Sequence, residues 1–75
     1  MTQLDVSYRY GTAPNEAEMR AIDNIREVYG IRRIVFNEKE KTVRVEYDAS
    51  RLQEPAVAGL LRRAGMDLKE KLVLA

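Results

Sequence analysis

The stretch RIVFNEKEKTVRVEY (residues 33–47) decides the fold, because it holds two strand patterns on either side of four charged residues, 38–41. Ile34 and Phe36, two residues apart, alternate with Arg33 and Asn37 before the charged segment. Three apolar residues alternate with Arg44 and Glu46 after it: Val43, Val45 and Tyr47. A period of two is typical of a half-buried strand. The stretch therefore predicts a β-hairpin that turns at residues 38–41.

A helix is predicted before the hairpin. Asn15 and Glu18 have the spacing of a capping box, in which each side chain accepts a hydrogen bond from the other residue's backbone. Gly30 is expected to end the helix. An apolar stripe at helical spacing lies between these two ends, at Met19, Ile22, Ile25 and Val28/Tyr29.

A second helix is predicted after the hairpin. Pro55 is tolerated only in a first helical turn, so the helix is expected to begin near Glu54 and to end at Gly65. Gly59 in its interior costs about 1 kcal/mol relative to alanine, which close packing against the sheet can offset. The apolar stripe consists of Val57, Leu60, Leu61 and Ala64.

Two further strands, one near each end of the chain, complete the pattern. Residues 4–10 alternate from Leu4 to Tyr10, and Met66 and Leu68 begin a fourth strand that an apolar tail follows. The order βαββαβ predicts one α+β domain over residues 1–75, a ferredoxin-like sandwich with sheet order 4-1-3-2 and both helices on one face. The expected core face of the sheet is Leu4, Val6, Tyr8, Ile34, Phe36, Val43, Val45, Tyr47, Met66 and Leu68.

Composition excludes several classes of site. The chain has 75 residues, no Cys, no His and a net charge of +1. Disulfides, thiolate or imidazole metal ligands and histidine bases are therefore absent. Neither half of the chain is strongly basic, so its charge gives no strong case for nucleic acid or anionic membrane. Asp5 and Arg9 interrupt the apolar stretch that a signal peptide needs, so we expect a cytoplasmic protein.

Three segments together resemble the heavy-metal-associated (HMA) domain, the family of copper chaperones and of the cytosolic domains of metal-pumping P-type ATPases. They are residues 30–36 (GIRRIVF), 42–48 (TVRVEYD) and 61–66 (LRRAGM), at the separations that the family shows. The resemblance covers about the whole chain and implies the same βαββαβ fold.

The family's metal site does not carry over. Its Gly-Met-x-Cys-x-x-Cys motif falls on residues 11–17, where Gly11 matches, Thr12 replaces Met, and Pro14 and Ala17 replace the two Cys. Because soft Cu(I) needs sulfur donors and structural Zn(II) needs thiolate or imidazole, the resemblance implies the scaffold without its metal centre, and we expect no cofactor.

Two surfaces are candidates for contact with a protein partner. The first is the loop that faces the partner in metal-carrying relatives, although a plain strand-to-helix connection is the favoured explanation for it. The second is the edge of the fourth strand, where an apolar extension either pairs with a second copy or folds back onto the core. The loop residues are Gly11, Thr12, Pro14, Asn15, Glu16 and Glu18, and the edge residues are Leu72, Val73 and Leu74.

Other side chains have a functional and a structural interpretation. Asn15, Glu16 and Glu18 offer oxygen donors to a hard cation, and Met19 and Met66 offer thioethers to Cu(I), but helix capping and core packing are the favoured explanations. The arginine doublets 32–33 and 62–63 are interpreted as solvated charges near element ends.

The leading hypothesis is a non-catalytic binding module that acts by protein–protein contact or self-association. No nucleophile–base pair and no glycine-rich phosphate loop is visible, so no enzyme activity is predicted. The open sheet face carries no aromatic residue for base stacking, which argues against RNA. Two alternatives remain: a metal-binding protein with oxygen or thioether donors, and an accessory subunit of an enzyme.

Overall fold

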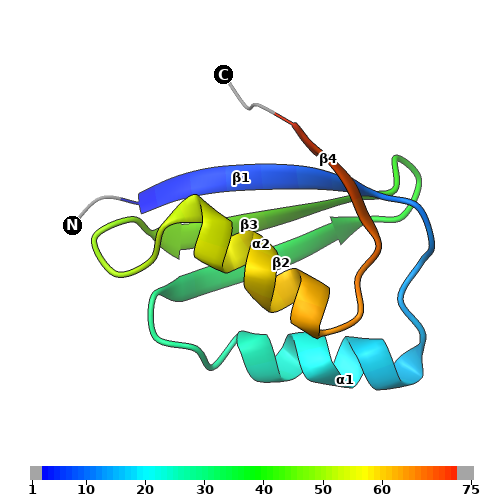
Figure 1. The fold of residues 1–75 in the computed structure, drawn as a ribbon, viewed down its shortest axis with the longest axis horizontal. Coiled ribbons are helices and arrows are strands. Elements are labelled where there is room, and N and C mark those ends of the chain that lie inside the picture. Colours follow the sequence, from blue (N-terminus) through cyan, green and yellow to red (C-terminus); the bar gives the residue numbers. More distant parts are fainter. Residues whose placement is uncertain (1–2, 73–75) are drawn as a thin grey trace.

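A computed structural model describes residues 3–72 and contains a four-stranded antiparallel sheet and two helices (Figure 1). The elements follow in the order β1 (Gln3–Tyr10), α1 (Glu16–Ile25), β2 (Ile31–Asn37), β3 (Thr42–Asp48), α2 (Glu54–Arg63) and β4 (Leu68–Leu72). The α+β class is confirmed, and the arrangement is compatible with a small ferredoxin-like fold. The sheet order is β2-β3-β1-β4, which reads β4-β1-β3-β2 from the other edge.

One face of the sheet carries the core. Val6, Tyr8, Val43 and Val45 are buried on this face, and the buried residues of both helices join the same apolar cluster. Between them on the strands lie charged residues such as Arg9 and Arg44, which are exposed on the other face. Figure 1 shows α2 lying across the sheet, with α1 alongside. Burial of one sheet face under two helices therefore organises the fold.

Several expectations about the core need correction. Leu4, near the start of β1, is 46% exposed, whereas Tyr10 is only 2% exposed and contacts Phe36 edge-on. Phe36 and Leu68 are half-buried and pack against the core from its margin. The alternation is correct along β1, but the helices cover only part of the strand.

The first helix ends earlier than predicted. α1 ends at Ile25, and residues 26–30 form turns, so Val28 and Tyr29 of the predicted stripe are not helical. Tyr29 is consequently 70% exposed, and Gly30, with φ +104°, leads into β2 instead of ending the helix. By contrast, α2 begins at Glu54 with Pro55 in its first turn, as predicted.

The fourth strand begins later than predicted. Met66 is buried in the turn before the strand, and β4 runs from Leu68 to Leu72. Gly65 precedes it with φ +101°, so the turn after α2 has the left-handed residue that glycine favours. Leu72, predicted as part of a tail, therefore belongs to the strand, while Val73 and Leu74 lie outside the described residues.

Gly59 and Gly65 should respond oppositely to alanine. A Cβ at Gly59 meets no atom within 4 Å, so close packing does not offset its helix cost, and Gly59→Ala should raise the unfolding free energy by about 1 kcal/mol. Gly65→Ala should lower the unfolding free energy by about 1–2 kcal/mol, because its φ is left-handed and its Cβ would lie 2.7 Å from Glu18 Oε2. Urea denaturation of both variants measures this, and equal effects would contradict the assignment.

Candidate functional site

The predicted interaction loop is largely occupied by helix capping. Asn15 caps α1: its Oδ1 accepts from the Glu18 backbone N–H at 2.8 Å, and Glu18 Oε1 accepts from the Asn15 N–H at 2.9 Å. The capping box is thus confirmed. Glu16 forms an ion pair with Arg20 at 3.0 Å on the exposed side of the helix. These polar groups stabilise the start of α1.

The rest of the loop lies on the surface. Gly11 donates its backbone N–H to the Asp67 carbonyl at 3.0 Å, which ties the loop to the turn before β4. Thr12 and Ala17 are exposed and Pro14 is half-buried. The loop residues line neither of the two hollows described below. Docking on this loop stays a prediction.

Each donor of the metal alternative has a structural role. Met66 is buried and Met19 is half-buried against the core, while Glu16 and Glu18 are engaged with Arg20 and Asn15. Within residues 3–72, no group of three or more Asp, Glu, His or Cys side chains is placed to hold a metal ion. Capping and packing account for each of these donors separately.

A polar cluster that the sequence analysis missed lies between α2 and β4. The Tyr8 hydroxyl donates a 2.6 Å hydrogen bond to Glu54 Oε2, and the Lys71 ammonium donates a 3.2 Å bond to Glu54 Oε1. Three elements supply these groups: β1, the first turn of α2, and β4. Both oxygens of the Glu54 carboxylate therefore have a donor.

A β-bulge places Lys71 in this cluster. Arg9 lies opposite Glu70, but the next residue, Tyr10, lies opposite Leu68, so Lys69 has no partner in β1. Directly opposite residues share a sheet face. The extra residue therefore turns Glu70 to the open face, where it pairs with Arg9 at 3.3 Å, and turns Lys71 to the helix-covered face opposite Tyr8.

The electrostatics of the cluster oppose proton transfer near neutral pH. Burial raises the pKa of Tyr8 far above its ordinary value, and the hydrogen bond to Glu54 and the negative charge of Glu54 raise it further. The hydrogen bond from Tyr8 lowers the pKa of Glu54, and Lys71 and Arg62 lower it further against the opposing effect of burial. Tyr8 thus stays protonated and Glu54 stays ionised.

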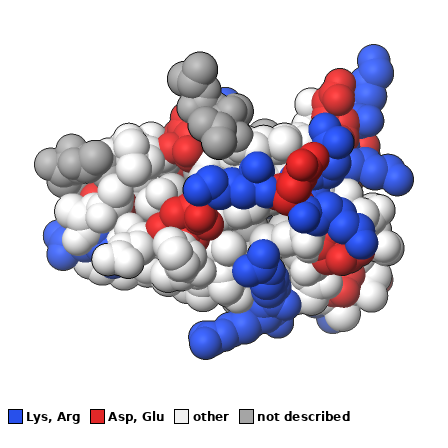
Figure 2. Space-filling model, turned by 45° about the horizontal axis from the view of Figure 1, so that its top comes forward, with Lys and Arg blue, Asp and Glu red and all other residues white. Residues whose placement is uncertain are grey.

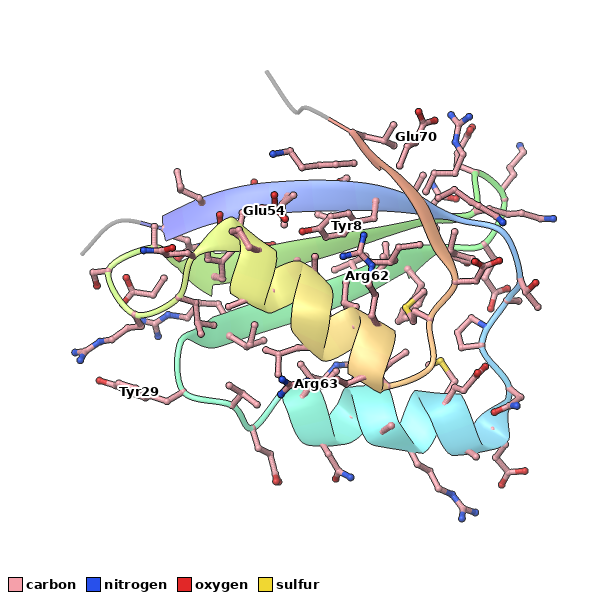
Figure 3. The ribbon with its side chains drawn as sticks, in the orientation of Figure 1. Tyr8, Tyr29, Glu54, Arg62, Arg63 and Glu70 are labelled. Atoms are coloured by element: carbon pink, nitrogen blue, oxygen red, sulfur yellow. The ribbon has the colours of Figure 1, made fainter. Side chains whose placement is uncertain are left out.

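A hollow of about 330 Å³ adjoins the cluster, and we call it the α2–β4 hollow. Its apolar lining comes from Pro55, Ala58 and Leu68. Figure 3 shows Tyr8, Glu54 and Arg62 facing the space between α2 and β4. The hollow is lined by Tyr8, Glu54, Pro55, Ala58, Arg62, Leu68, Lys69, Glu70 and Lys71.

The two arginines at the end of α2 face different surroundings. Arg62 lines the α2–β4 hollow, whereas Arg63 lines a separate hollow of about 270 Å³ with Val28, Leu52 and Leu60. Figure 3 shows Arg63 on the α1 side of the helix. The doublet that the sequence presents as one solvated feature is therefore divided between two sites.

One face of the molecule is of mixed charge. Figure 2 shows Lys and Arg side chains interspersed with Asp and Glu over the face that it presents. At the end of the sheet near the α1–β2 turn, the Arg51 guanidinium stacks 4.5 Å from the centre of the exposed Tyr29 ring. Arg51 also lies 3.8 Å from the buried Asp48, so both of its neighbours come from the fold itself.

The signal for the polar cluster was present but ambiguous. Tyr8 belongs to the alternating apolar pattern of β1. That pattern predicts a buried ring but gives no information about the partner of its hydroxyl. Glu54 and Lys71 are two of many charged residues, and they lie 17 positions apart. A phenol in a core strand needs a hydrogen-bond partner, and that need was the usable clue.

Tyr8→Phe tests the energetics of the cluster. The variant should lose about 1–2 kcal/mol of unfolding free energy at pH 7, because Glu54 loses a charge-assisted hydrogen bond inside the fold. Since the pKa of Glu54 is depressed from 4.5 in the folded state, the loss should shrink as the pH falls below about 4.

At alkaline pH, Tyr8→Phe should change the pH dependence of the unfolding free energy in the opposite direction. The pKa of Tyr8 is raised in the folded state, so wild type should lose stability as the pH rises above 10, and Tyr8→Phe should lose less. Urea denaturation across the pH range measures both limbs. Tyr29→Phe, at an exposed position, is the matched control. Equal stability of Tyr8→Phe and wild type at pH 7 would show that the hydroxyl contributes nothing.

No helix within residues 3–72 has the length and apolar character that crossing a membrane requires.

Comparison with known proteins assigns no family to the chain. No protein-family model matches the chain, and no curated protein sequence matches it.

Proposed function

We propose that the chain is a small non-catalytic binding domain of ferredoxin-like fold that takes an extended segment of a protein partner along the outer edge of β4. The observation that carries the proposal is the position of β4: within residues 3–72 it has a strand neighbour, β1, on one side only. Such an edge presents unpaired backbone N–H and C=O groups that a further strand can bond.

The other edge of the sheet is less available. β2 also has one strand neighbour, but the Arg26 side chain donates from outside the sheet to the Ile34 carbonyl at 3.2 Å. A side chain on a strand's backbone competes with an incoming strand. The contrast favours β4 as the edge that binds.

The charges of β4 favour a different chain over a second copy. In a two-fold antiparallel pair, the residue on the symmetry axis lies opposite its own copy. An axis at Leu68 or Leu72 would overlap only one residue of the two β4 strands. Every register with a longer overlap puts the axis at Lys69, Glu70 or Lys71, where two like charges face each other, which is destabilising. A partner segment has no such constraint on its sequence.

The chemistry of the polar cluster supports a binding role rather than catalysis. A general acid or base needs a pKa near the working pH. Tyr8 and Glu54 shift each other away from that range, in opposite directions. The HMA resemblance supports the same proposal, since Pro14 and Ala17 leave the family scaffold without its thiolate metal ligands.

Alternate N-methylation of a peptide tests strand addition. A short acetylated, Thr- and Val-rich peptide with one central Glu should perturb the β4 amide resonances and slow their hydrogen exchange. Methylating every second backbone nitrogen should abolish binding in one of the two alternating patterns and spare it in the other, because alternate N–H groups of an added strand point toward its neighbour. Equal effects of both patterns, or perturbation of another surface, would overturn the proposal.

Sedimentation tests the choice of partner. The free chain should sediment as a monomer at micromolar concentration, because self-pairing of β4 places like charges together. A dimer whose interface maps to the β4 amides would make a second copy the occupant and would overturn the assignment of a separate partner.

A further inference from the structure

We propose that the α2–β4 hollow is a carboxylate-binding site anchored by Arg62, and that it accepts an Asp or Glu side chain of the segment added to β4. The proposal rests on the proposed function and names the chemistry of the partner: an extended, acidic peptide segment.

Arg62 is the lining charge whose donors are unused. Three of the other charged residues of the hollow are paired within the fold: Lys71 with Glu54 at 3.2 Å, Lys69 with Asp67 at 3.3 Å, and Glu70 with Arg9 at 3.3 Å. Arg62 forms no hydrogen bond or ion pair with any residue in the range 3–72. Its guanidinium therefore has donors available for a ligand.

Neither carboxylate of the lining pairs with the Arg62 guanidinium, since Glu70 pairs with Arg9. Glu54 already accepts from the Tyr8 hydroxyl at one oxygen and from Lys71 at the other. The charge of Arg62 does reach this group, since it lowers the pKa values of both Glu54 and Tyr8. Glu54 thus holds Tyr8 and Lys71 in place along the wall and leaves Arg62 free to bind a second carboxylate.

The lining suits a carboxylate on a short aliphatic stem. Three cations and two anions line the hollow, so the net charge of its lining is positive. One of the anions, Glu70, forms its ion pair with Arg9 at the open face of the sheet. Pro55, Ala58 and Leu68 offer apolar contact to methylene groups. The volume of about 330 Å³ is many times what one water needs, so a side chain fits.

The hollow lies where a strand added to β4 would project a side chain. Residues of an added strand alternate between the two sheet faces. A residue opposite Lys71 points to the helix-covered face, because Lys71 itself does. The hollow opens on that face beside β4, so the backbone of the partner would bond the strand edge while one acidic side chain reaches Arg62. Arginine binds carboxylates in a two-pronged geometry that lysine cannot reproduce.

The test compares two peptides and two arginine variants. The Glu-containing peptide should bind wild type about tenfold more tightly than the same peptide with Gln at that position, the ratio expected for one charge-assisted contact. Arg62→Gln should abolish the difference between the peptides. Arg63→Gln, which removes an equal charge from the next residue but from another hollow, should leave it unchanged.

Arg62→Lys separates geometry from charge. This variant should retain part of the preference for Glu, because the positive charge remains while the two-pronged contact is lost. Raising the salt concentration should reduce the preference in wild type, since the hollow is open to solvent. Amide spectra of each free variant confirm that the fold is intact.

The outcomes separate this site from the proposed function. If both peptides perturb β4 equally and bind with equal affinity, strand addition stands and the carboxylate site is overturned. If neither peptide binds, but sodium acetate shifts the Arg62 side-chain Nε resonance and not that of Arg63, the carboxylate site stands without an extended partner and the proposed function is overturned. If Arg63→Gln abolishes the preference as Arg62→Gln does, the assignment to the α2–β4 hollow is wrong.

Discussion

Burial of a single face of the sheet is the constraint on which the rest of this structure depends. β1 and β3 lie at the centre of the sheet, and their apolar residues alternate with charged ones, so only one face can be covered by helices. α1 and α2 both place their buried residues on that face. The open face keeps its charges, and the exposed edges and the α2–β4 hollow are what remains available to a partner.

Tyr8 connects this constraint to the candidate site. Its ring belongs to the buried face of β1, and burial leaves its hydroxyl in need of an acceptor. Glu54 supplies one from the first turn of α2, and Lys71 completes the contact from β4. One core residue thus holds the start of a helix beside the edge strand, and the hollow between them results from that arrangement.

The sequence predicted the parts of the fold that depend on local pattern. The Asn15–Glu18 capping box, the start of α2 at Glu54 and the turn at Gly65 are all encoded by residues within a few positions of one another. The sequence prediction was wrong where an apolar pattern continues beyond the end of the element. Val28 and Tyr29 extend the stripe of α1, but the chain turns after Ile25 in order to enter β2.

By itself, the sequence determined the type and order of the elements and the buried face of β1 and β3, because periodicity and capping act between near neighbours. Only the tertiary structure decided that Tyr8, Glu54 and Lys71 meet, and that Arg62 and Arg63 serve different surfaces. These outcomes depend on a crossover that places α2 beside β4 and on a bulge that leaves Lys69 without an opposite residue in β1. An extra residue in a strand reverses which face the following side chains occupy, and its position is set by long-range packing rather than by local pattern.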